Sequence, residues 1–350
     1  MKRSARIGRR PVRRLFLIAG AVAVFATAPL SFASPAKAAA TATASGQGID
    51  DFYAAQGGQL LWLRAGQADA ARELLGLLET AEADGLDPGK YKVKSLAKAV
   101  EKASGGGPGQ VRKADEMLSE AFVAYARDLR IAPAAGMRFA DPRLRPGPPS
   151  PRALLLMAQS APPLTVFVNS MGWMNPAYAP LRRALVRRSF ETDRQRDLLQ
   201  VNLERARVLP GKRARYVIVN AAAQRLDMYE DGKLVDSMRV VVGRERPKDR
   251  TPMLASFLTH ASLNPYWNVP ADLAAERIAP NVVKQGLGYL KRHGYELLSD
   301  WGDNATLVDP ATVDWQAVAD GRVEVRLRQL PGKGNSLGKV KFTFPNSFGV

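Results

Sequence analysis

Residues 264–270 read Asn264-Pro265-Tyr266-Trp267-Asn268-Val269-Pro270 and separate two groups of short β-type runs. The earlier runs are residues 216–220, 225–230 and 234–242, and the later ones are residues 323–328 and 339–344. Asp231-Gly232 joins the second and third runs, and both residues tolerate the positive φ that a two-residue hairpin turn requires. The pattern predicts a mainly-β domain over residues 215–350, with a long interruption at residues 271–321.

Several short motifs in this domain resemble, in order and spacing, the catalytic domain of the L,D-transpeptidases, which has the YkuD-type fold. They are residues 216–220, 229–233, 239–243, 251–252, 264–270, 313–315, 328–332, 335–338 and 341–346. The resemblance is closer still to the large class of this family, which carries an all-helical scaffold domain in front. It implies that residues 271–321 form a lid, or capping subdomain, and that Tyr266, Trp267 and Asn268 bind substrate.

The chain departs from the family after Phe344-Pro345-Asn346. There the family carries a His-Asp-Thr-Pro run and then a Ser-His-Gly-Cys motif, which provides the catalytic thiol and its base. This chain stops at Val350 and contains no Cys. We therefore expect a C-terminally incomplete catalytic domain with no catalytic residues of its own, inactive alone, and with an exposed apolar face around Val340, Phe342 and Phe344.

Residues 49–210 read as helical. Leu118, Phe122, Tyr125 and Leu129 recur at spacings of four, three and four, which is typical of one buried helix face. The leucines of residues 68–83 form a similar stripe that ends at Gly85. Residues 192–209 predict a further amphipathic helix, and Ser150-Pro151 and Asn175-Pro176 are typical helix starts.

The same helical region resembles the scaffold domain of the large class, through residues 52–53, 61–63, 83–87, 125–130 and 202–205. Many members of that class insert a small peptidoglycan-binding module after the scaffold domain. The stretch between Arg188 and Thr192 is too short to hold one, so we expect it to be absent. The whole chain is thus predicted to be a multi-domain α + β protein, with an all-α domain followed by a mainly-β domain that contains a lid.

Residues 1–38 read as an export signal, with seven basic residues before an apolar core at residues 15–28. Ala36-Lys37-Ala38 is a cleavage site of the A-x-A type, and Ser31-Phe32-Ala33 is an alternative. Arg13-Arg14 resembles the arginine pair of a twin-arginine signal, but a Sec signal can also contain paired arginines, so both export routes remain open. Small and polar residues 39–48 predict a linker. The protein is expected in the periplasm or cell envelope, with no stable membrane span after cleavage, although an uncleaved anchor stays open.

The formal net charge is +18, and eight of these charges lie in the signal, which leaves +10 for the rest of the chain. This charge favours an anionic partner such as the cell wall, a membrane face or a nucleic acid, or it is simply a solvated basic surface. The chain has no Walker motif and no G-x-G-x-x-G motif, and we expect neither a cofactor nor nucleic-acid binding. The absence of Cys excludes disulfides and zinc–thiolate sites.

Other candidate sites are weaker. Residues 334–338 spell the G-x-S-x-G of a nucleophile elbow, but a strand-like run follows where the elbow needs a helix. His260 and His293 have no helix-spaced histidine partner, so no metal site is expected. Glu230 with Asp231 flanks a hairpin turn, which favours a surface position. Trp301, Trp315 and Tyr289 either stack on a ligand or, as we favour, pack the lid.

Three functions follow. By resemblance, the full-length family member cross-links peptidoglycan stem peptides through a Cys acyl-enzyme, and this chain is an incomplete form of it. Alternatively, the chain is a non-catalytic, exported peptidoglycan-binding or scaffolding protein, whose helical domain contacts other cell-wall enzymes. The third possibility is a basic exported protein that binds another polyanion.

Overall fold

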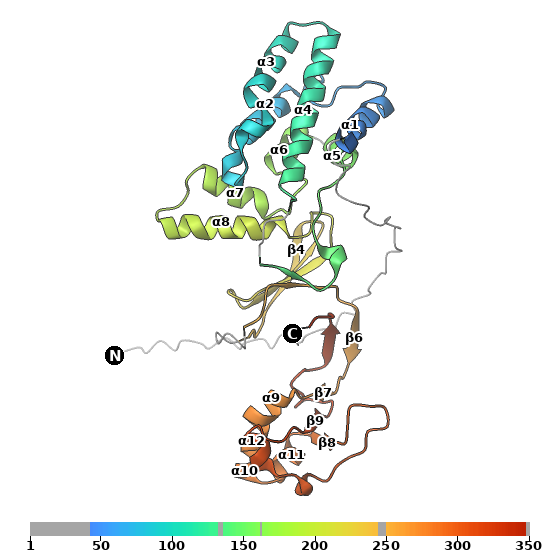
Figure 1. Cartoon of the computed structure of the whole chain (residues 1–350), viewed down its shortest axis with the longest axis vertical. Helices are drawn as coiled ribbons and strands as arrows, with labels where there is room; N and C mark the ends of the chain where they lie inside the picture. The colour runs from blue at the N-terminus through green and yellow to red at the C-terminus, as the bar shows by residue number, and fades with distance from the viewer. Residues whose placement is uncertain (1–42, 132–135, 162, 244–249, 348–350) are drawn as a thin grey trace, which may run out of the picture. The chain divides into compact units, whose positions relative to one another are not determined.

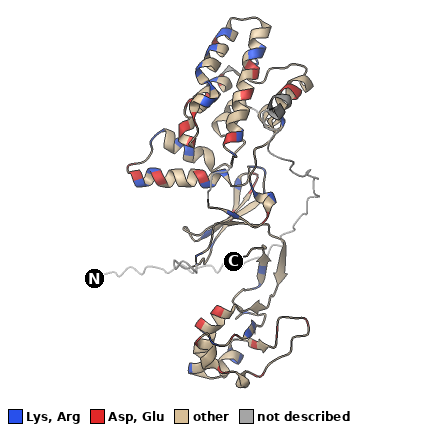
Figure 2. Ribbon diagram, viewed as in Figure 1, with Lys and Arg blue, Asp and Glu red and all other residues tan. Residues whose placement is uncertain are grey.

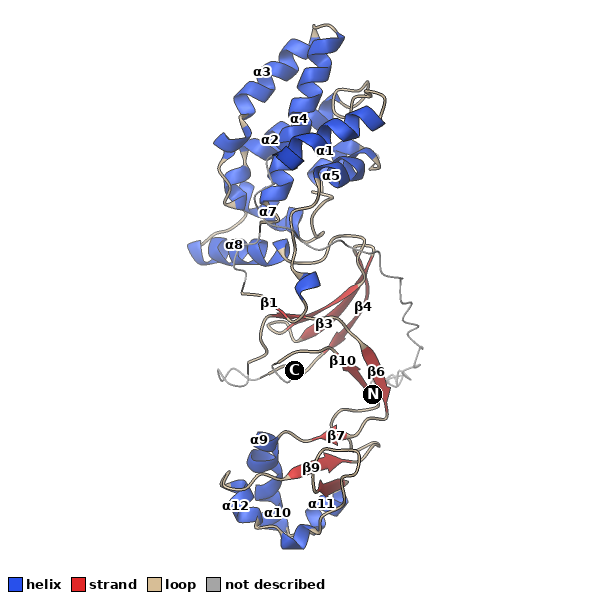
Figure 3. Cartoon of the chain, turned by 45° about the vertical axis from the view of Figure 1, so that its right-hand side comes forward, coloured by secondary structure: helices blue, strands red, loops and turns tan. Residues whose placement is uncertain are grey.

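The computed structural model describes residues 43–131, 136–161, 163–243 and 250–347. Helices are concentrated in residues 43–207 and strands in residues 216–343 (Figures 1 and 3). The multi-domain α + β class predicted from the sequence is confirmed. The predicted export signal lies outside the described residues. Within the described ranges, no helix combines the length and the apolar character needed to cross a bilayer.

The N-terminal region is helical, with short 3₁₀ turns between the α-helices. The α-helices are α1 (Thr43–Ala55), α2 (Ala68–Glu79), α3 (Val93–Ser104), α4 (Pro108–Asp128), α5 (Pro151–Gln159), α6 (Leu164–Asn169), α7 (Tyr178–Val186) and α8 (Asp193–Arg207). The 3₁₀ turns are η1 (Ala81–Asp84), η2 (Pro88–Tyr91) and η3 (Pro142–Leu144). Charged residues of both signs lie along α8 (Figure 2).

The apolar stripe predicted on α4 is the centre of the helical core. Leu118, Phe122, Tyr125 and the adjoining Leu129 are each 0% exposed. The ring of Phe122 meets Trp173 edge-to-face, with ring centroids 4.9 Å apart. Buried leucines of α2 join the same cluster. The hydrophobic spacing in the sequence therefore identified the buried face of the long helix correctly.

Helix ends follow the sequence signals, with one exception. The Ser150 hydroxyl accepts a hydrogen bond from the Ala153 amide at the start of α5, at 3.2 Å. Thr192 forms a capping box with Gln195 at the start of α8. Asn175 also accepts a backbone bond, from Ala177, but α7 begins only at Tyr178. Asn175-Pro176 thus forms a turn ahead of the helix rather than its first residues.

The predicted linker at residues 39–48 is wrong from Thr43 onward, because α1 begins there. Ile49, Phe52 and Tyr53 of this helix are buried in the core. Their burial stabilises the helix, and the small residues before them continue its hydrogen-bonded turns. Composition alone predicted a flexible segment because it cannot register this packing.

Two buried carboxylates hold the helical region together. The Asp115 carboxylate accepts hydrogen bonds from the backbone amides of Leu61, Trp62 and Leu63 at 2.7–2.8 Å, and from the Tyr53 hydroxyl at 2.6 Å. These bonds fix the irregular segment between α1 and α2 against α4. Burial, and then the charge and hydrogen bond of Asp115, raise the pKa of Tyr53 far above its ordinary value, so this phenol remains a donor.

The second carboxylate, Asp84 at the end of η1, joins two further elements, α4 and α7. It accepts from Tyr125 at 2.7 Å, from Tyr178 at 2.8 Å and from the guanidinium of Arg182 at 2.8 Å. The side chain of Asp84 is 0% exposed and that of Arg182 is 6% exposed. This ion pair is therefore fully desolvated, and each of its charges depends on the other.

The first strands form an antiparallel meander in the order β2–β3–β4, with β2 at Tyr216–Asn220, β3 at Arg225–Glu230 and β4 at Lys233–Arg239. Asp231 and Gly232 turn the chain with φ values of +50° and +73°, as the predicted hairpin requires. β4 ends at Arg239 and not at residue 242, because its partner β3 begins only at Arg225, opposite Arg239.

Two further strand pairs follow the meander. β5 (Leu254–Ala255) pairs in parallel with β1 (Arg138–Phe139), which lies between α4 and α5. β6 (His260–Leu263) pairs antiparallel with β10 (Val340–Thr343). In the sequence, residues 256–263 read as one strand, but the strand is confined to the second half of that range, where β10 provides a partner. Val340 and Phe342 are exposed, at 37% and 52%, whereas Phe344 is half-buried.

The predicted lid contains α9 (Ala271–Leu273), the π-helical turn η5 (Ala274–Ile278), α10 (Ala279–Gln285), α11 (Gly288–Arg292), β8 (Tyr295–Leu298), the 3₁₀ turn η6 (Pro310–Thr312) and α12 (Trp315–Ala319). Together with β7 (Trp267–Asn268) and β9 (Arg326–Gln329) it forms a sheet in the order β7–β9–β8. This subdomain has its own apolar core, which includes Ile278, Val282, Leu297, Trp315 and Leu327.

Two expectations for the lid need correction. The strand predicted at residues 323–328 is β9, and it begins at Arg326, where it meets β8. In the sequence, residues 273–283 read as one helix that Pro280 breaks, but residues 271–285 form one continuous helical run. The turn before Pro280 widens to π geometry, and this widening relieves the clash between the proline ring and the carbonyl four residues earlier.

Candidate functional site

Residues 264–270 carry the chain from β6 into the lid. The amide of Asn264, a residue with φ of +47°, donates to the carbonyl of Lys339 at 2.8 Å. Trp267 and Asn268 then form β7 and pair with β9. The amide of Val269 donates to the Leu327 carbonyl at 2.8 Å, and its side chain is buried. The motif on which the family resemblance centres is thus the fixed connection between the β6–β10 pair and the lid.

A buried asparagine holds the loop of residues 334–338 against this connection. The Asn335 side-chain amide lies within hydrogen-bonding distance of the carbonyls of Pro265, at 3.1 Å, and Leu330, at 3.0 Å. Its side-chain oxygen accepts from the Leu337 amide at 2.8 Å. Gln329 on β9 accepts from the Ser336 amide at 2.9 Å. These bonds fix Ser336 at the edge of the lid.

The G-x-S-x-G pattern is not a nucleophile elbow. Its loop lies between two strands, β9 and β10, whereas the elbow needs a helix after its serine. Among the described residues neither histidine hydrogen-bonds to Ser336. His260 on β6 is exposed, and its Nδ1 lies 3.1 Å from the Thr259 hydroxyl. The His293 ring contacts Tyr289 in a tilted arrangement, with ring centroids 4.4 Å apart. Across the described ranges, no three His, Asp or Glu side chains gather as metal ligands.

The lid and the segments beside it line an open cavity of about 470 Å³, called here the lid cavity. It combines aromatic, charged and uncharged polar walls, formed by Trp267, Leu273, Glu276, Arg277, Ile278, Pro280, Asn281, Tyr289, Tyr295 and Ser336. Its volume lies within the range of small-molecule binding sites. Because the lining comes from β7, the helical run, β8 and the Ser336 loop, folding of the whole lid is needed to create it.

Only one of the three predicted substrate-binding residues lines the lid cavity. Trp267 does, but Tyr266 and Asn268 do not, because side chains alternate along β7 and its flanks. Tyr266 is 49% exposed and lies under the guanidinium of Arg328, with 4.4 Å between the guanidinium carbon and the ring centroid. Asn268 is exposed and pairs through its backbone with Arg328.

The other aromatic candidates separate into different roles. Trp315 is a core residue, 7% exposed, whose indole donates to the Pro310 carbonyl at 2.8 Å, as packing of the lid predicts. Tyr289 packs on the core and also lines the lid cavity. Trp301 is 48% exposed and does not line the lid cavity.

Several cavity residues were missed in the sequence. Tyr295 stacks near Tyr289, with ring centroids 6.5 Å apart, and burial, then the neighbouring Tyr289, raise the pKa of its phenol. Its hydroxyl therefore stays a donor at neutral pH. Glu276, Arg277 and Asn281 come from the helical run around the π turn, and Pro280 inside a helical pattern was the available signal for that turn.

Comparisons with known families agree with the two-part organisation. Residues 47–185 match the family model described as Scaffold domain, and residues 214–350 match the model described as L,D-transpeptidase catalytic domain, named YkuD. A protein of Haemophilus influenzae named "Putative L,D-transpeptidase" is 36% identical over 149 residues. The aligned segment covers 43% of this chain and 29% of that protein, so the match spans less than a third of the relative's length.

The scaffold match falls on the helical region and the catalytic match on the strands and the lid. The chain therefore joins a Scaffold domain to a YkuD catalytic domain and belongs to the L,D-transpeptidase family.

Proposed function

We propose that this chain binds peptidoglycan stem peptides and that the lid cavity receives part of the stem. The supporting observation is the position of the cavity within residues 214–350, which match the catalytic domain, with Trp267 of the central motif in its wall. Aromatic rings at Trp267, Tyr289 and Tyr295 offer flat apolar surfaces to peptide planes and aliphatic chains. Ser336, Asn281 and the charged residues provide groups that orient a polar ligand.

The reaction implied by the family resemblance is acyl transfer through a thiol. A Cys thiolate attacks the carbonyl of the L,D amide in a donor tetrapeptide stem, a thioester forms and the terminal D-Ala leaves with its amine. The side-chain amine of diaminopimelate in a second stem then attacks the thioester and releases the thiolate. These 350 residues contain no Cys. We therefore propose that they bind stems but form no 3→3 cross-links alone.

The proposed location is the periplasm or cell envelope, reached through an export signal at residues 1–38. The formal net charge of +18, of which +10 lies outside the proposed signal, favours the anionic surroundings of a cell wall. Residues 49–210 are proposed to contact other cell-wall enzymes. A non-catalytic role in binding or scaffolding is the alternative function, and the lack of a thiol in this sequence favours it.

Binding to purified sacculi tests the proposal. The chain is expected to sediment with sacculi, and soluble stem peptides should release it, whereas a non-wall polyanion should not. Trp267→Ala should weaken sedimentation, and Trp301→Ala, which removes an exposed indole outside the lid cavity, serves as the matched control. Failure of the unmodified chain to sediment, or equal effects of the two variants, would contradict stem binding in the cavity.

Muropeptide analysis of sacculi incubated with the chain tests its chemistry. No 3→3 cross-linked products are expected. Their appearance would show that residues other than a thiol carry the transfer and would overturn the proposed division between binding and catalysis.

A further inference from the structure

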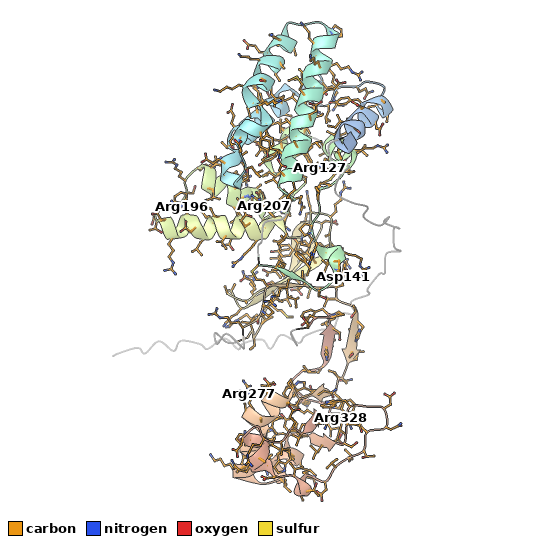
Figure 4. All side chains as sticks on the ribbon, viewed as in Figure 1. Arg127, Asp141, Arg196, Arg207, Arg277 and Arg328 are labelled. Atoms are coloured by element: carbon orange, nitrogen blue, oxygen red, sulfur yellow. The ribbon has the colours of Figure 1, made fainter. Side chains whose placement is uncertain are left out.

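We propose that Arg277 is a specificity-determining residue that receives a single carboxylate of the peptide bound in the lid cavity. This inference rests on the proposed function, since it names the group of the stem peptide that the cavity recognises. Figure 4 shows Arg277 on the helical run that begins with α9. Its contacts distinguish it from the other arginine labelled in the lid, Arg328.

The local backbone around Arg277 is unusual. The amide of Ala279 donates to the carbonyl of Ala274, five residues earlier, which is the π-helical spacing. π turns are rare in proteins, and those that occur are often found at functional sites. The Asn281 side chain donates to the carbonyl of Arg277 itself at 2.7 Å and so holds this turn in place. The widened turn therefore presents Arg277 to the lid cavity on a fixed backbone.

Arg277 and Arg328, the two arginines that Figure 4 labels in this subdomain, differ in their ion pairing. The guanidinium of Arg328 pairs with Glu296 at 2.7 Å and stacks on Tyr266. Among the described residues, no carboxylate forms an ion pair with the guanidinium of Arg277, although it lines the cavity. A planar guanidinium binds a carboxylate through two parallel hydrogen bonds, so a bound ligand can provide the partner that the described protein residues do not.

The remaining walls restrict the kind of carboxylate ligand. Trp267, Tyr289 and Tyr295 favour peptide planes and aliphatic chains rather than a densely charged polymer. Glu276 also lines the cavity, so the lining carries one acidic and one basic side chain. A ligand with one carboxylate matches Arg277, the single basic side chain of this lining, whereas a polyanion would find no second basic side chain in it. Stem peptides offer such carboxylates on D-glutamate and on diaminopimelate.

Calorimetric titration of the full chain with synthetic stems tests the inference. The probes are the tripeptide L-alanyl-γ-D-glutamyl-meso-diaminopimelate and three forms of it, each amidated at one carboxyl: that of D-glutamate or one of the two of diaminopimelate. The unmodified protein is expected to bind the free tripeptide about 10-fold more tightly than one of the amidated forms, the loss typical of a charged hydrogen bond. The form that binds weakly identifies the carboxylate.

Two variants and one control separate recognition from general damage. Arg277→Gln should bind the free and the amidated tripeptides equally, and Arg277→Lys should keep part of the preference because it keeps the charge. Lys284→Gln removes one positive charge from the same helical run, outside the cavity lining, and should retain the full preference. Thermal melts of the three variants check that the lid remains folded.

The outcomes are distinguishable. Equal affinity of the unmodified chain for all four tripeptides overturns the role of Arg277 and leaves stem binding intact. An equal loss of affinity in Arg277→Gln for free and amidated tripeptides also overturns that role. If no tripeptide binds to the unmodified chain, the proposed function fails, and this inference fails with it.

Discussion

The buried ion pair of the helical region gives the sharpest stability prediction. Asp84→Ala removes the acceptor of both Tyr125 and Tyr178 and leaves the Arg182 guanidinium buried without its carboxylate. Breaking a buried pair in this way costs about 3 to 5 kcal/mol. A domain of about 150–250 residues loses roughly 2 to 4 °C in Tm per kcal/mol, so the helical transition should fall by roughly 6 to 20 °C.

Far-ultraviolet circular dichroism on heating or in urea measures this loss, because most of the helix lies in the same region as the pair. Asp193→Ala is the matched control. Its carboxylate pairs with Arg196 at 2.9 Å but is 85% exposed, and such pairs contribute about 0 to 1 kcal/mol. The double variant Asp84→Ala, Arg182→Met should recover part of the stability, since it removes the uncompensated charge. A loss below about 1 kcal/mol for Asp84→Ala would refute the assigned role of the pair.

Three further predictions concern single residues. Partial desolvation, and then the neighbouring carboxylates of Glu116 and Asp50, raise the pKa of the exposed Glu120 carboxyl. The folded chain therefore binds this proton more tightly than the unfolded chain, and stability falls as pH rises through the interval between the two pKa values. Glu120→Gln should therefore raise Tm at pH 7, with the difference vanishing near pH 3; a constant difference would contradict this. Gly232→Val, at φ of +73°, should cost about 1 to 2 kcal/mol in melts, since a Cβ there would lie 2.7 Å from the Lys212 side chain. Asn335→Ala should cost about 1 to 3 kcal/mol by urea denaturation and speed hydrogen exchange at Leu337; unchanged exchange would argue against the loop role of Asn335.

The parts of the fold that depend on local pattern were predictable. The spacing of Leu118, Phe122 and Tyr125 identified the buried face of α4, and Asp231-Gly232 identified the β3–β4 hairpin. In each case residues close in the chain fix the geometry, so periodicity and turn chemistry are sufficient. Strand ends were less accurate: β4 and β9 are shorter than expected because a strand ends where its partner ends, and the partner is set by distant pairing.

In the candidate site, too, local pattern predicted some residues, and contacts between distant segments decided the others. The central motif pointed to Trp267, and strand alternation then turned Tyr266 and Asn268 away from the cavity that Trp267 lines. The two other cavity aromatics lie on α11 and β8, and no short-range pattern connects them with residues 264–270. Arg277 was not predicted as a site residue for a different reason. Pro280 predicted a helix break, whereas a π turn accommodates the proline and the helical run stays continuous.

The amino-acid sequence alone indicated the α + β organisation through its periodicity, and the resemblance to the family through the order of its motifs. The absence of Cys is a property of the sequence itself. Tertiary structure decided which side chains meet: Asp84 with Arg182, Asn335 with the carbonyl of Pro265, and Trp267 with Tyr289 and Arg277 around one cavity. The physical reason is that a buried charge, a buried amide and a cavity wall each need partners from elsewhere in the chain. Only the packing of the complete subdomain brings those partners within reach.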